Sequence, residues 1–443
     1  MTVIEDFASW GSGFGKQPVA ADVLHSAKRS VIDWYAALLP GAVVAPATML
    51  EKALADEMDA GPCTLAFGRK ATARAAALIN GTAAHTVEVD DIFREAIYHP
   101  GAPTIAAALA AAQATGASGA AFLNGVIAGY EISTRIGEAM GRAHYRFWHN
   151  TGTIGTFGAA SAAARIYELD SERFAHALAI AATFAAGLQQ AFRSDSLAKP
   201  LHAGKAAENG LLAAVAAREG VTGTLDMLEG EAGMGRAMST SPDWQSGVAT
   251  LGSHFNITHM TVKNHACCGH TFAPIDGAQE ALRRLNVKAA EIARVRVETY
   301  RTALDVAGNP NPQTASEARF SLAYVIATAL VHGSVRLAAF EPMRLSDPAT
   351  RALMGRIEFA VDDKIDADFP RRRAARVTIE TTDARSETVL QPDRKGDPEL
   401  PLTDAELEEK YRELAIPVVG QTKAAALLQH LWALETLPSL ALL

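Results

Sequence analysis

Apolar residues recur at helical spacing from about residue 22 to residue 262. One such stripe consists of Leu24, Ala27, Val31 and Tyr35, and a later one consists of Phe122, Val126 and Tyr130. These segments are rich in alanine, which favours helix and lets neighbouring helix axes approach closely. Glycine-containing turns separate them, and the alternation typical of strands is nearly absent. The pattern predicts a large all-helical domain over residues 1–266.

The pattern changes after about residue 266, where charged and apolar residues begin to alternate. Residues 292–300 include the run Arg-Val-Arg-Val-Glu, which is typical of a half-buried strand. Further segments are predicted as strands at 357–361, 376–381 and 387–390, and as helices at 316–330 and 348–354. Together they indicate a smaller α+β domain over residues 267–402. Thr403 followed by an acidic turn predicts a capped helix start, with helices continuing to about residue 436.

Composition narrows the class of protein. A chain of 443 residues exceeds the usual size of one hydrophobic core, and 49% hydrophobic with 20% charged residues indicates a folded globular protein. A net charge of -8 argues against a nucleic-acid binder. Three cysteines are too few for a disulfide framework, and the acidic N-terminus has no apolar run, so we expect a cytoplasmic protein. The uncharged stretch 96–130 is interrupted by a turn and contains many small residues, so two buried helices are expected there rather than a membrane span.

Histidines are the first candidates for chemistry. Ten of the thirteen lie between His85 and His270, in a part of the chain that is otherwise poor in charge. Imidazole titrates near neutral pH, so these residues are acid/base candidates, although a structural role is the more common one for any single histidine.

Two segments combine histidines with acids or glycines. Glu88, Asp90 and Asp91 precede His99, and Pro103 suits the first turn of a helix whose N-terminus would favour an anion; a capped loop is the alternative. Tyr145 and His149 precede the glycine-rich stretch 151–158. No strand comes before that stretch, so we expect close helix packing there rather than a dinucleotide site.

Two further segments combine lysines with other reactive groups. The segment from Arg193 to Lys199 leads into a helix start, where the Lys199 ammonium would serve an anion unless it is simply solvated. The segment from Lys263 to His270 contains His265, Cys267 and Cys268. Adjacent cysteines lack the usual spacing of zinc ligands and no second cysteine cluster exists, so we expect no metal.

Three of these segments, residues 80–103, 199–206 and 263–270, resemble the signature stretches of the MmgE/PrpD (2-methylcitrate dehydratase-like) family in order and spacing. The segment 317–322 and the turn Gly396-Asp397-Pro398 extend the resemblance over essentially the whole chain.

The resemblance implies a mainly α fold with a large helical domain, a smaller α+β lid domain, and C-terminal helices, residues 403–443, that return to the helical domain. It also implies a homodimer and a cofactor-free active site in the cleft between the domains. The expected partner is a small polycarboxylate substrate, with no nucleic acid and no membrane.

The resemblance also implies site residues. The catalytic candidates are Lys263, Tyr145, His149 and His99, with Lys263 and either Tyr145 or His149 favoured as the acid/base pair. The candidates for substrate binding are Lys199, Arg193, Asp91, Glu88, His270 and Cys268.

Three departures from the family pattern bear on the reaction. Dehydratases and decarboxylases of the family usually carry Asp-x-Asp-Asp-Thr where this chain reads Glu-Val-Asp-Asp-Ile, so Ile92 replaces a hydroxyl-bearing residue. One additional residue separates Asp91 from His99, and Cys268 stands in place of a catalytic histidine of the decarboxylases. These departures favour an epimerase that acts on iminodisuccinate or a similar amino- or imino-dicarboxylate. The alternatives are a dehydratase of 2-methylcitrate-type acids, a cis-aconitate-type decarboxylase, and a non-catalytic carboxylate-binding protein.

Overall fold

The computed structural model describes residues 1–192 and 196–441. The chain forms two compact units, Met1–Thr261 with Thr403–Leu443 and Val262–Leu402. The first boundary therefore lies after Thr261 rather than after residue 266. The reason is that the Val262 N–H donates to the carbonyl of Gly396, within the smaller unit (2.9 Å).

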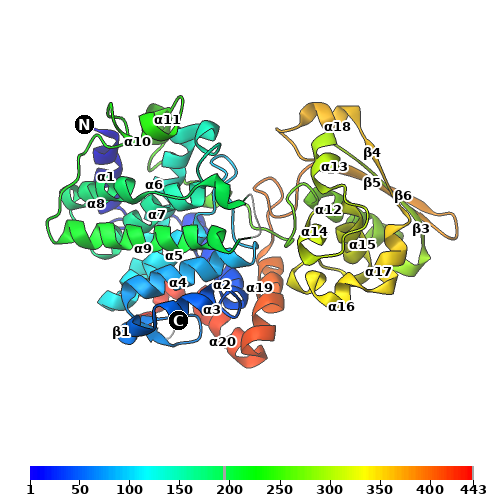
Figure 1. Cartoon of the computed structure of the whole chain (residues 1–443), viewed down its shortest axis with the longest axis horizontal. Coiled ribbons are helices and arrows are strands. Elements are labelled where there is room, and N and C mark those ends of the chain that lie inside the picture. Colours follow the sequence, from blue (N-terminus) through cyan, green and yellow to red (C-terminus); the bar gives the residue numbers. More distant parts are fainter. Residues whose placement is uncertain (193–195, 442–443) are drawn as a thin grey trace. The chain divides into compact units, whose positions relative to one another are not determined.

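The larger unit is built almost entirely from helices (Figure 1). They are α1 (Val3–Gly13), α2 (Ala21–Gly41), α3 (Ala47–Ala53), α4 (Ala73–Thr86), α5 (Gly101–Thr115), α6 (Gly119–His144), α7 (Asn150–Ile166), α8 (Ser171–Phe184), α9 (Ala198–Arg218), α10 (Met234–Met238), α11 (Trp244–Ala249), α19 (Asp404–Val419) and α20 (Gln421–Trp432). The uncharged stretch 96–130 contains α5 and the start of α6, as expected. No helix among the described residues combines the length and apolarity that a bilayer crossing requires.

Small residues let the central helices approach closely. Gly81 of α4 faces Gly204 of α9, and a Cβ atom added at Gly204 would lie 2.1 Å from the hydroxyl of Thr82 and 2.2 Å from the carbonyl of Leu78. Any larger side chain at Gly204 would push α4 and α9 apart. This contact fixes the C-terminal end of α4 beside the first turns of α9, where several of the candidate histidines lie.

One element of the larger unit was missed by the sequence analysis. Strand β1 (Met58–Thr64) pairs antiparallel with the two-residue strand β2 (Lys70–Ala71). The sequence of β1, Met-Asp-Ala-Gly-Pro-Cys-Thr, contains glycine and proline and lacks the β-branched alternation that would have indicated a strand.

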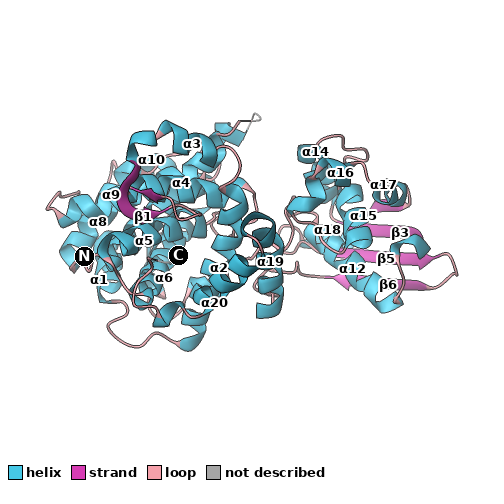
Figure 2. Cartoon of the chain, turned by 90° about the horizontal axis from the view of Figure 1, so that it is seen from below, coloured by secondary structure: helices cyan, strands magenta, loops and turns pink. Residues whose placement is uncertain are grey.

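The smaller unit contains a four-stranded sheet in the order β4-β3-β5-β6. The strands are β3 (Ile292–Thr299), β4 (Ile357–Val361), β5 (Ala375–Thr381) and β6 (Ser386–Gln391), close to the predicted segments. Strands β3 and β4 run parallel, and the other pairs are antiparallel. Helix α12 (Phe272–Leu285) packs against β5 and β6 (Figure 2).

The other helices of the smaller unit are α13 (Arg301–Ala307), α14 (Ala315–Arg319), α15 (Leu322–His332), α16 (Pro342–Leu345), α17 (Pro348–Met354) and α18 (Asp363–Asp368). The single helix predicted at 316–330 is thus divided. Ser321 lies between α14 and α15, and its hydroxyl accepts from the Tyr324 N–H as the N-cap of α15. A serine that bonds the backbone in this way starts a new helix instead of continuing the preceding one.

Candidate active site

Four histidines of the larger unit lie side by side: His85 at the end of α4, His99 before α5, His149 at the N-cap of α7, and His202 in the first turns of α9. The ring centroid of His85 lies 4.8 Å from that of His99 and 5.4 Å from that of His149. Nδ1 of His149 lies 3.0 Å from Nδ1 of His202. Residues far apart in the sequence thus form one histidine cluster.

Asp90 connects two of these histidines, and we call Asp90, His85 and His99 the Asp90 cluster. Nδ1 of His85 donates to Oδ2 of Asp90 (2.7 Å), and Nδ1 of His99 lies 3.2 Å from the same oxygen. Burial opposes ionisation of Asp90, but His99 and His85 hold the pKa of its carboxyl well below the ordinary value. A carboxylate that binds Nδ1 fixes the ring of each histidine and directs its Nε2 away from the aspartate.

The two rings differ in access to solvent. The side chain of His85 is 0% exposed, whereas that of His99 is 14% exposed. His99 is therefore the member of the Asp90 cluster that a substrate can reach, and His85 supports it from the interior.

The segment that carries Asp90 is held in place by the C-terminal helix α19. The buried ammonium of Lys410 donates to the carbonyl of Val89 (2.7 Å) and forms an ion pair with Asp33 of α2. The two C-terminal helices thus belong to the larger unit, and α19 also positions the acidic segment of the candidate site.

Asp91, which was predicted to bind substrate, faces the protein interior. Its two oxygens accept from the Gly101 N–H (3.0 Å) and from the Tyr130 hydroxyl (2.7 Å). Burial, reinforced by the nearby Asp33 carboxylate, raises the pKa of Asp91 to about 7. These contacts give Asp91 a structural role at the start of α5.

His149 and His202 are held in the uncharged form near neutral pH. Burial, reinforced by the charges of His85 and Lys199, lowers the pKa of each imidazole. A neutral pair is also consistent with their contact, in which one Nδ1 donates and the other accepts.

Lys199 lies in the first turn of α9, where its ammonium donates to the carboxylate of Glu88 and lies 5.3 Å from the ring centre of Phe192. Lys199 and Glu88 were both predicted to contact substrate, and the structure pairs them with each other. Arg193 lies outside the described residues. No hydrogen bond or ring contact joins Tyr145 to the histidine cluster in the described part of the chain, although Tyr145 precedes His149 by only four residues.

The other predicted residues belong to the smaller unit. Lys263 is buried. His270 Nδ1 bonds the hydroxyl of Tyr300 (2.7 Å), and burial together with Arg373 and Arg394 lowers the pKa of His270 to about 4. Burial raises the pKa of the Cys268 thiol. His270 and Cys268 are therefore neutral at physiological pH.

Side chains of the types that bind metal ions occur close together in the sequence or structure at two places. His265 bonds Asp276 (2.9 Å), Cys267 bonds Thr271 (3.1 Å) and His270 bonds Tyr300, so these side chains are directed to separate partners. Among the described residues, the group with ligand-type spacing is the Asp90 cluster, whose ligand atoms lie within 4.8 Å of one another. The expectation of a metal-free enzyme thus stays a prediction, and this cluster is the place where a metal would bind.

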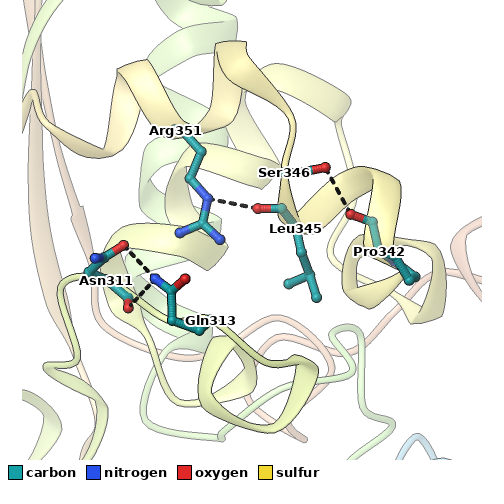
Figure 3. Close-up of a pocket in the computed structure, with 6 residues that line it drawn as sticks. All are labelled: Asn311, Gln313, Pro342, Leu345, Ser346 and Arg351. Atoms are coloured by element: carbon teal, nitrogen blue, oxygen red, sulfur yellow. Dashed lines mark hydrogen bonds between the residues drawn. The ribbon is translucent and has the colours of Figure 1, made fainter.

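An open pocket in the smaller unit lies between the loop before α14 and helices α16 and α17 (Figure 3). It is lined by Asn311, Gln313, Pro342, Leu345, Ser346 and Arg351. The Arg351 guanidinium donates to the carbonyls of Leu345 (2.7 Å) and Pro312 (2.9 Å). None of the predicted acid/base residues lines this pocket, so its chemistry does not resemble that of the candidate site.

Several residues of the candidate site were not assigned a role from the sequence. Asp90, His85 and His202 stood within the conspicuous segments, but only their contacts show that they belong with His99 and His149. A histidine five residues before a buried aspartate, at a helix end, was the available indication. No feature of the sequence singled out Arg373, because it is the last of three consecutive arginines.

The comparisons with known proteins agree with this two-unit architecture. The profile of the MmgE/PrpD N-terminal domain matches residues 5–247, and that of the MmgE/PrpD C-terminal domain matches residues 265–435. The cis-aconitate decarboxylase-like protein oryM of Aspergillus oryzae is 29% identical over 98% of this chain and 95% of its own length. Cis-aconitate decarboxylase of Aspergillus terreus is 27% identical over 95% of this chain and 91% of its own, and that of Homo sapiens is 27% identical over 83% and 78%. Since the two profiles together span most of the sequence, the chain belongs to the MmgE/PrpD family.

Proposed function

We propose that this protein is an enzyme that moves a proton at a carbon next to a carboxylate of a small polycarboxylate, without a cofactor. The observation that carries the proposal is the Asp90 cluster. A buried carboxylate orients the imidazole of His99, and His99 is the partly exposed member of the cluster. An imidazole fixed through Nδ1 has Nε2 available to accept and return a proton.

The step requires positive charge as well as a base. Removal of the proton places the electron pair of the C–H bond in an enediolate, which needs preorganised cations to receive the charge. Lys199 and Lys263 are assigned this role, and Arg193 is a secondary candidate. The contact between Lys199 and Glu88 keeps the ammonium ordered, and a substrate carboxylate would replace Glu88 as its partner.

For the overall reaction we propose epimerisation of an amino- or imino-dicarboxylate such as iminodisuccinate. One group must remove the proton and a second must return a proton to the opposite face of the same carbon. The candidates for these two roles are His99, His149, Tyr145 and Lys263. Ile92 offers no hydroxyl to a departing group, and Cys268 is a neutral thiol where the family's decarboxylases have a histidine. Both features favour return of the proton over elimination.

Decarboxylation of a cis-aconitate-type acid is the second candidate, and the names of the relatives favour it. In that reaction carbon dioxide leaves with cleavage of a C–C bond, and the enzyme protonates the resulting carbanion. The orienting role of Asp90 is common to both reactions. A homodimer and a cytoplasmic location stay predictions.

Proton NMR in deuterated water tests the proposal and separates the candidates. Iminodisuccinate and cis-aconitate would each be incubated with the full-length enzyme. Epimerisation gives interconverted stereoisomers with deuterium at the inverted carbon, whereas decarboxylation gives a shorter unsaturated acid. Absence of both deuterium exchange and product formation from either acid would count against the assignment of these substrates.

A further inference from the structure

Three consecutive arginines precede β5 and have different environments. Arg371 is exposed and pairs with Asp368 (2.5 Å), and Arg372 is exposed and lies 4.0 Å from Asp393. Arg373 is partly buried, and within the described residues it forms no hydrogen bond or ion pair. Burial, together with Arg394, lowers the pKa of Arg373. The arginine that is most protected from water is thus the one whose guanidinium forms no direct ion pair with a carboxylate among the described residues.

A second guanidinium lies on the same side of the smaller unit. Arg394 forms a bidentate contact with Asp397, with N–O distances of 2.7 and 2.9 Å. Both arginines approach Gly269: an added Cβ at Gly269 would lie 3.0 Å from Nη1 of Arg394 and 3.7 Å from Nη1 of Arg373. Asp397 pairs directly with Arg394 and also attracts Arg373, so the two guanidinium groups share this carboxylate and a net positive charge is left at this point.

Such an arrangement is unfavourable unless an anion completes it. A partly dehydrated cation without a partner is destabilising, and a second cation nearby adds repulsion. Glycine at position 269 leaves room for both guanidinium groups to approach the start of the segment that leads into α12. The planar guanidinium of arginine matches a carboxylate through two parallel hydrogen bonds.

We infer that Arg373 binds one carboxylate group of the substrate and makes the smaller unit selective for polycarboxylates. The inference rests on the proposed function and deepens it, since it assigns a charge-binding residue to the smaller unit in addition to Lys263. The ligand class is a small organic acid with at least two carboxylates.

The neighbouring side chains are consistent with an anion at Arg373. His270 and Tyr300 are joined by a hydrogen bond, and the low pKa of His270 keeps its ring neutral at physiological pH. Cys268 also stays neutral because its thiol pKa is raised. None of these three groups supplies a negative charge that would compete for the guanidinium.

The test is calorimetric titration of the full-length protein with tricarballylate, a stable tricarboxylate, and with glutarate, which lacks the central carboxylate. Arg373→Met should weaken binding of tricarballylate by about 30- to 1000-fold, as for loss of one partner of a dehydrated charge pair. Arg373→Lys keeps the charge but loses the two-pronged geometry, so we expect a loss of about tenfold. Arg372→Met is the matched control and should bind within about twofold of wild type, since surface pairs contribute little.

The inference is overturned if folded Arg373→Met or Arg373→Lys binds tricarballylate as tightly as the wild-type protein, or if wild type binds neither acid at millimolar concentration. A thermal melt of each variant establishes that it is folded. Binding that depends on Arg373 without any proton exchange would leave this inference intact and refute the proposed reaction. Proton exchange that is unaffected by Arg373→Met would refute this inference and leave the proposed reaction intact.

Discussion

Replacement of Asp90 by asparagine tests the central device of the site. Asparagine has the same shape as aspartate but lacks the charge, and an uncharged amide oxygen in the place of Oδ2 accepts weaker hydrogen bonds from His85 and His99 than the carboxylate does. Because His99 then loses its fixed orientation, proton transfer should slow. The change leaves the histidines themselves in place, so its effect isolates positioning from the presence of the base.

The size of the effect follows from the contacts. Asp90 is 1% exposed, and one of its oxygens lies 2.7 Å from Nδ1 of His85 and 3.2 Å from Nδ1 of His99. General acid–base catalysis contributes about 100- to 10,000-fold to a rate, and loss of an orienting carboxylate has effects up to the top of that range in enzymes with a carboxylate–histidine pair. We expect kcat to fall by about 100- to 10,000-fold with little change in KM.

The assay is the rate of deuterium incorporation from solvent, with Asp91→Asn as the matched comparison. Asp91 undergoes the same isosteric change one residue along the chain, but its pKa of about 7 means that its charge is already partly absent at neutral pH. Asp91→Asn should therefore lower kcat by less than Asp90→Asn does. If folded Asp90→Asn keeps kcat within about tenfold of wild type, below the range expected for a proton-transfer role, the positioning argument is wrong.

Three further predictions concern stability and metals. Lys410→Met leaves Asp33 as a buried charge without its cation and should lower the free energy of unfolding by about 3–5 kcal/mol in a urea titration, whereas the exposed control Lys423→Met should change it by less than about 0.5 kcal/mol. Because the folded pKa of Asp91 is raised from 3.8 to about 7, its contribution to stability is fully present below pH 3.8 and is lost as the pH rises to about 7. The free energy of unfolding of Asp91→Asn, relative to that of wild type, should therefore rise by roughly 4 kcal/mol between these pH values. A difference between the two proteins that stays constant with pH would contradict the assigned titration. Dialysis against a strong chelator should leave turnover unchanged, and activity that is lost and then restored by one metal ion would assign that ion to the Asp90 cluster.

Much of the fold could be predicted because its elements have regular patterns. The alanine-rich stripes indicated the helices of the larger unit, and the alternating run at 292–300 indicated β3. The hairpin β1–β2 could not be found, because it is short and contains Gly61 and Pro62. Its pairing depends on tertiary contacts rather than on intrinsic strand propensity.

The candidate site was only partly predictable. The segments containing His99, His149 and Lys199 were recognisable, but the partner of each side chain depends on how distant helices pack. Lys199 illustrates this, since its pairing with Glu88 joins positions 111 residues apart. Arg373 shows the same limitation, because its sequence neighbours are equally basic and only its burial distinguishes it from them.

Proton NMR of iminodisuccinate with the metal-free wild-type enzyme in deuterated water is the most direct test of the proposed epimerisation. We expect interconversion of stereoisomers, incorporation of deuterium at the inverted carbon, and no olefinic product. Rapid formation of an alkene from 2-methylcitrate or a related hydroxy-acid, or release of carbon dioxide from cis-aconitate, without any stereoisomer exchange, would contradict the proposed epimerisation.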